Sequence, residues 1–159
     1  MTPAVIFLVF NRPTLTRRVF ESIRAARPPQ WFVVADGPRV DRVGESENCA
    51  EVRRLIEEGI DWPCELVRDY SDINLGCGKR VATGITNAFR RVEEAIILED
   101  DCLPDPTFFP FCEELLGRYR NEITVALIAG CRFQAPREAS ERPSYYFSRY
   151  PHCWVLATW

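Results

Sequence analysis

The sequence predicts an α/β domain whose doubly wound, mostly parallel sheet carries helices on both faces. Two observations lead to this fold class. Short apolar runs alternate along the chain with segments in which apolar residues recur every three or four positions, as strands alternate with helices. The run Ala95–Leu98 is apolar without alternation, which indicates a strand buried on both sides and hence a parallel sheet. The 159 residues suffice for one domain with a sizeable core.

The first strand and the first helix follow from these patterns. Ala4–Phe10 is apolar throughout and predicts a buried strand. After a turn at Asn11–Pro13, Thr14 is the expected N-cap of a helix that runs to Ala26 and is stopped by two prolines. The apolar residues that share the inner face of this helix are Leu15, Val19, Ile23 and Ala26.

The same alternation continues through the middle of the chain. Trp31–Ala35 is a second apolar strand, and Ser46 is the expected N-cap of a helix that Gly59 closes. Cys64–Arg68 predicts a third, shorter strand, and the loop Asp69–Gly78 leads into a third helix. Inward-facing apolar residues are Val52, Leu55 and Ile56 in the second helix and Val81, Ile85, Ala88, Phe89 and Val92 in the third.

The last third of the chain contains an acidic strand end and then a weaker pattern. Ala95–Leu98 runs directly into Glu99-Asp100-Asp101, and Pro106–Arg120 predicts a helix with clustered large apolar side chains. Ile123–Ala129 predicts a fifth strand. After it we expect a polar loop, an aromatic segment and an apolar tail that ends at Trp159. We expect this tail to pack against a further part of the protein or against another copy in a homo-oligomer.

Composition and cysteine usage exclude several classes of protein. The net charge is −3 and no basic run occurs, so a nucleic-acid surface is not indicated. The first apolar run is too short for a bilayer and lacks the features of a signal peptide, so we expect no transmembrane segment and a cytoplasmic location. The seven cysteines form no CxxC pair and His152 is the sole histidine, so we expect reduced thiols rather than a zinc site.

Polar side chains of the kind that bind ligands follow three of the predicted strands. They are Asn11 and Arg12 after the first, Asp36 after the second, and Glu99, Asp100 and Asp101 after the fourth. Because the carboxyl ends of parallel strands share one edge of the sheet, these side chains can converge on one crevice. The sequence therefore predicts a binding site at this edge.

The chemistry of these groups suits a phosphorylated ligand. Arg12 can bind a phosphate or carboxylate, and Asp36 can accept hydrogen bonds from a base or a ribose. Two carboxylates about 4 Å apart repel by roughly 4 kcal/mol at an effective dielectric of 20. A hard dication, Mg²⁺ or Mn²⁺, is the expected counter-charge, with Asp101 as its ligand. Each group also has an alternative interpretation without a ligand. Arg12 could form a surface salt bridge, Asp36 could form an Asp-Gly turn, and the acidic triplet could be a turn exposed to solvent.

The segment Asn74–Arg80 opens the third predicted helix with two glycines. A glycine such as Gly76 ahead of a helix N-terminus lets backbone N–H groups approach an anion, and Lys79 or Arg80 adds positive charge. Neither the P-loop spacing nor the dinucleotide-binding glycine pattern is complete here. A helix cap with an exposed basic turn is the alternative interpretation.

Four segments together carry a resemblance to a known family, namely Phe10-Asn11-Arg12-Pro13, Ala35-Asp36-Gly37, Asn74-Leu75-Gly76, and Leu98-Glu99-Asp100-Asp101 with the downstream Pro104-Asp105-Pro106-Thr107-Phe108-Phe109. In them the chain resembles nucleotide-diphospho-sugar transferases of the Rossmann-like GT-A fold, the nearest being bacterial sugar transferases distantly similar to N-acetylglucosaminyltransferase I. The resemblance implies that Asp101 binds Mn²⁺ or Mg²⁺ on the nucleotide diphosphate and that Glu99 and Asp100 contact the ribose or sugar. It likewise implies that Asn11 and Arg12 lie near the nucleotide and that Asp36 contacts the base.

The activity implied by the resemblance is transfer of a sugar from a UDP-type donor to a hydroxyl of a saccharide or other acceptor. Residues 1–159 would then form a single donor-binding domain, with the acceptor-binding half missing. Two alternatives stay open. A sugar-nucleotide pyrophosphorylase normally has a glycine-rich loop directly after the first strand, where this chain has Asn11-Arg12-Pro13. A non-catalytic domain could instead bind a nucleotide or another chain through the apolar tail.

Overall fold

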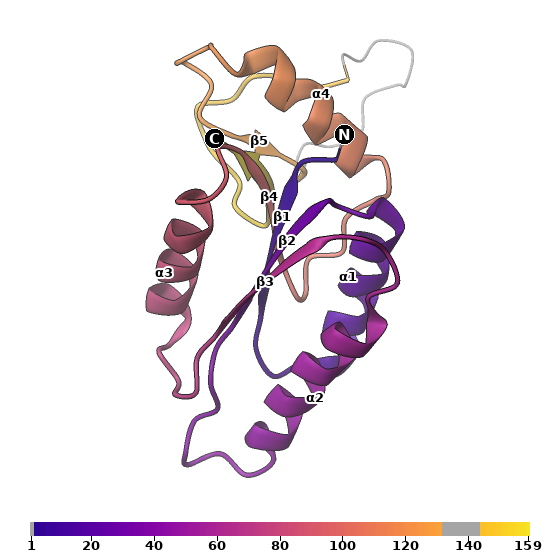
Figure 1. Cartoon of the computed structure of the whole chain (residues 1–159). Helices are drawn as coiled ribbons and strands as arrows, with labels where there is room; N and C mark the ends of the chain where they lie inside the picture. The colour runs from indigo at the N-terminus through magenta and orange to yellow at the C-terminus, as the bar shows by residue number, and fades with distance from the viewer. Residues whose placement is uncertain (1, 132–143) are drawn as a thin grey trace, which may run out of the picture.

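The computed structural model describes residues 2–131 and 144–159 (Figure 1). Strands and helices alternate through most of this range, as the sequence predicts. In chain order the elements are β1 (Ala4–Val9), α1 (Pro13–Ala26), β2 (Gln30–Ala35), α2 (Glu45–Gly59), β3 (Glu65–Tyr70), α3 (Cys77–Phe89), β4 (Ala95–Glu99), α4 (Phe108–Tyr119), β5 (Ile128–Ala129) and β6 (Val155–Thr158).

The strands form one mixed sheet in the order β3-β2-β1-β4-β6-β5. The first four strands in this order are mutually parallel, whereas β6 runs antiparallel to both β4 and β5. The predicted α/β class with a mostly parallel sheet is therefore confirmed, and the architecture is compatible with a Rossmann-like fold. Because β3, β2, β1 and β4 are parallel, their carboxyl ends lie along one edge of the sheet.

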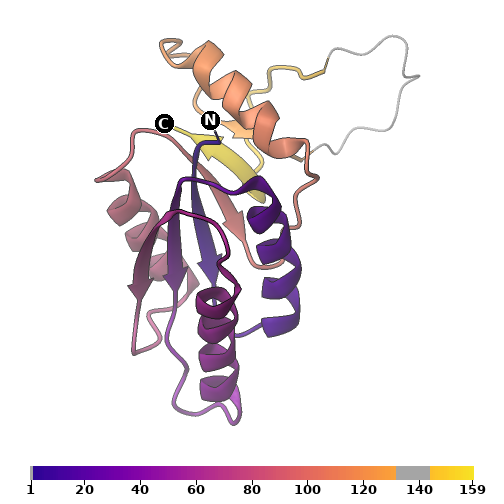
Figure 2. The same cartoon turned by 45° about the vertical axis from the view of Figure 1, so that its right-hand side comes forward.

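Helices cover both faces of the sheet, with α1 and α2 on one side and α3 on the other (Figure 2). Alternate residues of β1 divide between two cores: Phe7 packs with α1, α2 and α4, and Leu8 packs on the side of α3. The contact of α3 with the sheet is close at Gly84, where an added Cβ would collide with the side chain of Val34. None of the helices in the described ranges combines the length and apolar character that a membrane crossing requires.

Both predicted N-caps are wrong by two positions. Helix α1 begins at Pro13 with Arg12 as its N-cap, rather than at Thr14, because the fixed φ of proline suits the first helical position. Helix α2 begins at Glu45, and its N-cap is Gly44 with φ of 78°, a conformation that glycine adopts without strain. Strand β3 and helix α4 also differ by a few residues from the predicted 64–68 and 106–120.

The larger corrections concern the C-terminal third. Instead of a strand over 123–129, turns follow α4, Ile123 is 98% exposed and only Ile128–Ala129 pairs in the sheet. The apolar tail forms β6, which lies between β4 and β5, and its Ala157 is fully buried in this chain's own core. Local patterns do not reveal such pairing, because the partner strands are distant in sequence. Most of the polar loop predicted after Gly130 lies outside the described residues.

Candidate functional site

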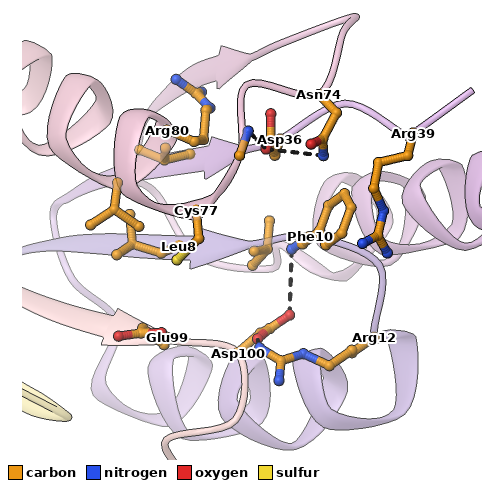
Figure 3. A pocket seen from close by; sticks show the side chains of 14 residues that line it. Leu8, Phe10, Arg12, Asp36, Arg39, Asn74, Cys77, Arg80, Glu99 and Asp100 are labelled. Atoms are coloured by element: carbon orange, nitrogen blue, oxygen red, sulfur yellow. Dashed lines mark hydrogen bonds and ion pairs between the residues drawn. The ribbon is translucent and has the colours of Figure 1, made fainter.

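A pocket of about 280 Å³ lies at the carboxyl edge of the parallel strands, on the side of α3 (Figure 3). Its walls come from the ends of β1, β2 and β4, the loop after β2 and the start of α3. The lining residues are Leu8, Val9, Phe10, Arg12, Val34, Asp36, Arg39, Asn74, Gly76, Cys77, Arg80, Val81, Glu99 and Asp100. The pocket thus lies where a parallel sheet positions ligands.

We predicted nine site residues, and six of them are among the residues that line this pocket: Arg12, Asp36, Asn74, Gly76, Glu99 and Asp100. The other three lie nearby or outside it. Asp101 follows directly on Asp100 and is held by Arg12. Asn11 donates to Glu45 Oε1 at 2.8 Å, and Lys79 is exposed on the first turn of α3. The structure therefore brings residues from three strand ends together, while their roles toward a ligand stay predictions.

Arg12 holds two members of the acidic triplet. Its Nη1 donates to Asp101 Oδ2 at 2.8 Å, and its Nη2 donates to Asp100 Oδ1. Asp100 is only 1% exposed, and its second oxygen accepts from the Phe10 N–H at 3.4 Å. The chain turns at once after Glu99, whose carbonyl accepts from the Cys102 N–H at 3.1 Å. The carboxylates therefore follow a turn, and do not alternate across the sheet.

The acidic triplet carries more charge than Arg12 compensates. Burial raises the pKa of Glu99, and the charges of Asp101 and Asp100 raise it further. Burial also raises the pKa of Asp100, although the hydrogen bond and charge of Arg12 oppose that shift. Burial lowers the pKa of Arg12, but pairing with Asp100 and Asp101 outweighs this and leaves that pKa raised. One guanidinium faces three carboxylates, so a divalent cation would match the excess negative charge.

The donor set at the triplet fits a hard cation only if other oxygen atoms complete its coordination. In the part of the chain that the structure describes, no group of three or more His, Cys, Asp or Glu side chains is placed to hold a metal ion. The Asp101 side chain is 42% exposed, and its Oδ1 has a long contact of 3.6 Å from Cys102 Sγ. Mg²⁺ commonly binds through one or two carboxylates, with waters and substrate phosphates as the remaining ligands.

The opposite wall of the pocket is built around Asp36, which is 6% exposed. Its oxygens accept from the N–H groups of Leu75 at 2.9 Å and Gly76 at 3.1 Å, and from Asn74 Nδ2 at 3.2 Å. They also accept from the N–H of Gly37 at 3.0 Å. Asp36 therefore ties the end of β2 to the loop before α3. Its predicted contact with a base stays a prediction, and both of its oxygens are engaged within the chain.

The N-terminus of α3 opens beside this wall. Gly76 is the N-cap with φ of 79°, which favours glycine, and no side chain caps the helix. The first N–H groups of such a helix are available to an anion, and the helix dipole favours negative charge there. Leu8, Val34 and Val81 form an apolar wall of the same pocket.

Two further arginines line the pocket, of which we named Arg80 only as an alternative to Lys79 and did not predict Arg39. Arg80 is 6% exposed, and it donates to the carbonyl of Ala35 at 3.2 Å and to Asp69 Oδ1 at 2.8 Å. The sequence holds a signal for this burial, because Arg80 is spaced by four residues from Gly84, which lies on the inner face of α3.

The second arginine, Arg39, lies in the loop after β2. Its Cζ is 5.6 Å from the centre of the Phe10 ring, and its Nε donates to Glu45 Oε2 at 3.0 Å. These hydrogen bonds to Arg39 lower the pKa of Glu45 to about 2. No local pattern predicts this contact, since the two residues meet across a loop of irregular structure.

Comparison with known proteins identifies no family for this chain, because no family model and no curated protein matches it. The function is therefore inferred from the chemistry of the pocket.

Proposed function

We propose that the chain is the donor-binding domain of a metal-dependent glycosyltransferase of the GT-A type, which uses a nucleotide-diphospho-sugar, with UDP as the expected nucleotide. One observation supports this most strongly. The uncapped N-terminus of α3 faces one pocket together with Arg12, Glu99 and Asp100, at the carboxyl edge of a parallel sheet, and Asp101 follows at its rim. An anion site and a cation site on opposite walls match a diphosphate that carries a divalent metal ion.

In this proposal each wall has its own task. The first N–H groups of α3, with Lys79 beside them, bind the diphosphate, and the apolar wall around Leu8 accommodates the nucleoside. Asp101 holds Mn²⁺ or Mg²⁺ at the rim, Arg12 orients Asp101 and Asp100, and Glu99 contacts the ribose or the sugar. When bound, the metal ion supplies Lewis-acid stabilisation of the charge that develops on the leaving diphosphate.

The second substrate in this proposal is a saccharide or another molecule with a free hydroxyl. All seven cysteines are free thiols in the structure. That state is typical of reducing compartments, so a cytoplasmic location is part of the proposal.

Calorimetric titration of the 159-residue chain with UDP, with and without Mn²⁺, tests the proposal directly. We expect saturable binding that requires the metal, because the acidic wall repels a diphosphate unless a cation lies between them. A titration with uridine separates the diphosphate from the base, and uridine should bind much more weakly. Absence of UDP binding in the presence of Mn²⁺ would contradict the proposal.

A further inference from the structure

The sheet continues beyond the pocket on the side of Glu99. Strand β6 is the next strand after β4, and the antiparallel ladder between them pairs Leu98 with Val155. The ladder ends at this pair; continued by one residue, its register would set Trp154, which lies at a bend just before β6, opposite Glu99. On that register Trp154 comes next to Glu99, on the side of the pocket away from Asp36, although it is not one of the lining residues.

The alternation of side chains places Trp154 on the same face of the sheet as the pocket. Val155 and Ala157 are buried in the core that lies under α1 and α4. Their neighbour Leu156 packs instead against the core on the side of α3. Successive strand residues point to opposite faces, and this alternation, continued by one residue before β6, assigns Trp154 to the face of Leu156 and Glu99.

Trp154 also differs from the other tryptophans in its exposure. Trp31 and Trp62 are 0% and 5% exposed and Trp159 is partly buried, whereas Trp154 is 56% exposed. On this face α3 packs mainly against β2 and β1, so the strip formed by β4 and β6 lies to the side of the helix. More than half of the Trp154 surface is therefore exposed to solvent.

We propose that Trp154 is a sugar-binding residue, whose indole face receives the hexose ring of the nucleotide-diphospho-sugar. This inference rests on the proposed function. A pyranose ring has an apolar face of C–H groups and a rim of hydroxyls. The C–H face can cover the indole ring, while the hydroxyls bond to a carboxylate such as that of Glu99. Tryptophan suits this task because it offers a large, rigid surface with few rotatable bonds.

The order of groups along the sheet edge explains why the sugar, and not the nucleoside, reaches Trp154. The apolar wall and the N-terminus of α3 lie toward β2, the acidic triplet lies at β4, and Trp154 follows at β6. An extended ligand whose diphosphate spans the middle of this row has its nucleoside at the enclosed end and its sugar at the open end. The transferred group must be open to a second substrate, and the exposed indole lies at that end.

The inference is tested by comparing UDP with four UDP-hexoses, namely UDP-glucose, UDP-galactose, UDP-N-acetylglucosamine and UDP-N-acetylgalactosamine, by calorimetry in the presence of Mn²⁺. For the unmodified chain we expect at least one UDP-hexose to bind more tightly than UDP. In Trp154→Ala that advantage should fall about tenfold, while the Kd for UDP itself stays within about twofold. Trp154→Tyr keeps an aromatic face and should restore most of the advantage.

Tyr150→Ala is the matched control, because Tyr150 is an aromatic residue of the same segment that is 79% exposed, and its loss should leave every Kd unchanged. The inference is overturned if the advantage survives in Trp154→Ala, if no UDP-hexose of the four exceeds UDP, or if UDP weakens to the same extent as the UDP-hexose. The last result would indicate a structural role. Failure of UDP to bind the unmodified chain would instead refute the proposed function, and this inference with it.

Discussion

The two walls of the pocket contain carboxylates that look alike in the sequence and differ in their surroundings. Asp36 follows β2 and accepts four hydrogen bonds from its own chain, three of them from backbone N–H groups. Glu99, Asp100 and Asp101 follow β4, and Arg12 is the cation that pairs with Asp100 and Asp101 in the described structure. A carboxylate whose two oxygens already accept hydrogen bonds from the protein stabilises the fold. Carboxylates that lie close together with uncompensated negative charge are suited to binding a cationic ligand.

The largest effect that we expect is a loss of stability when Asp36 is removed. Asp36→Ala leaves the N–H groups of Leu75 and Gly76, which are partly buried, without their acceptor. We expect the free energy of unfolding to fall by about 3 kcal/mol, because hydrogen bonds to a buried charge are strong and unmet donors are costly. Urea denaturation followed by circular dichroism measures this loss. A fall of less than about 1 kcal/mol would show that Asp36 does not organise this wall.

Substitution on the acidic wall should weaken ligand binding and leave the stability of the fold nearly unchanged. Asp101→Asn keeps the shape of the side chain and removes a charge that we assign to the metal ion. Metal-dependent binding of UDP should weaken by about a hundredfold, while stability changes by less than about 1 kcal/mol, since the pair with Arg12 is solvent-exposed. Calorimetry and urea denaturation of the same protein give both values.

Asp61→Asn is the control for that prediction. Asp61 also pairs with an arginine, Arg24, and its side chain is 44% exposed against 42% for Asp101. Asp61 lies outside the pocket, so the substitution should leave UDP binding unchanged. Equal losses in the two variants would remove the distinction between the acidic wall and an ordinary surface ion pair.

A smaller effect is expected at the N-terminus of α3. Gly76→Ala places a Cβ on a residue with φ of 79°, which should destabilise the protein by about 1 kcal/mol. Gly78→Ala is the control, because Gly78 is helical and an added Cβ meets nothing within 4 Å. That variant should be neutral or slightly more stable, since alanine favours helix. The melting temperatures of the two variants test this prediction. Equal shifts of the melting temperature would contradict it.

The smallest effect concerns pH and the pair Arg39–Glu45. Hydrogen bonds from Arg39 lower the pKa of Glu45 to about 2, so the pair stabilises the fold above the unfolded pKa of Glu45 and loses that contribution as pH falls toward 2. Arg39→Met should therefore reduce stability at pH 7 and differ less from the unmodified chain at pH 3. Urea midpoints at the two pH values test this. A difference that is constant with pH would exclude the ion pair as its source.

The predictable part of the fold was the part with local periodicity. Strands β1, β2 and β4 are apolar runs, and the parallel sheet that they imply brings Arg12, Asp36 and Glu99 to one edge. Pairing of β6 with β4 was not predictable, because antiparallel pairing between distant segments leaves no periodic signature in either one.

In the candidate site, too, the local sequence predicted some features, whereas contacts between distant segments could not be predicted. The residue types at the strand ends predicted where ligand-binding groups would gather. The hydrogen bonds that engage Asp36, and the contact of Arg39 with Glu45, depend on how two loops meet. Arg80 is the intermediate case, since its spacing from Gly84 indicates burial while its partners on β2 and β3 come from the tertiary structure.

The position of β6 has a consequence for how the molecule assembles. β6 is the last of these strands in chain order, yet it fills a place inside the sheet between β4 and β5. Until it inserts, one edge of β4 presents unpaired backbone groups, which can recruit other chains. Contacts of such long sequence separation form slowly. During synthesis the four parallel strands can therefore assemble first, and this flank stays prone to aggregation until β6 has emerged and docked.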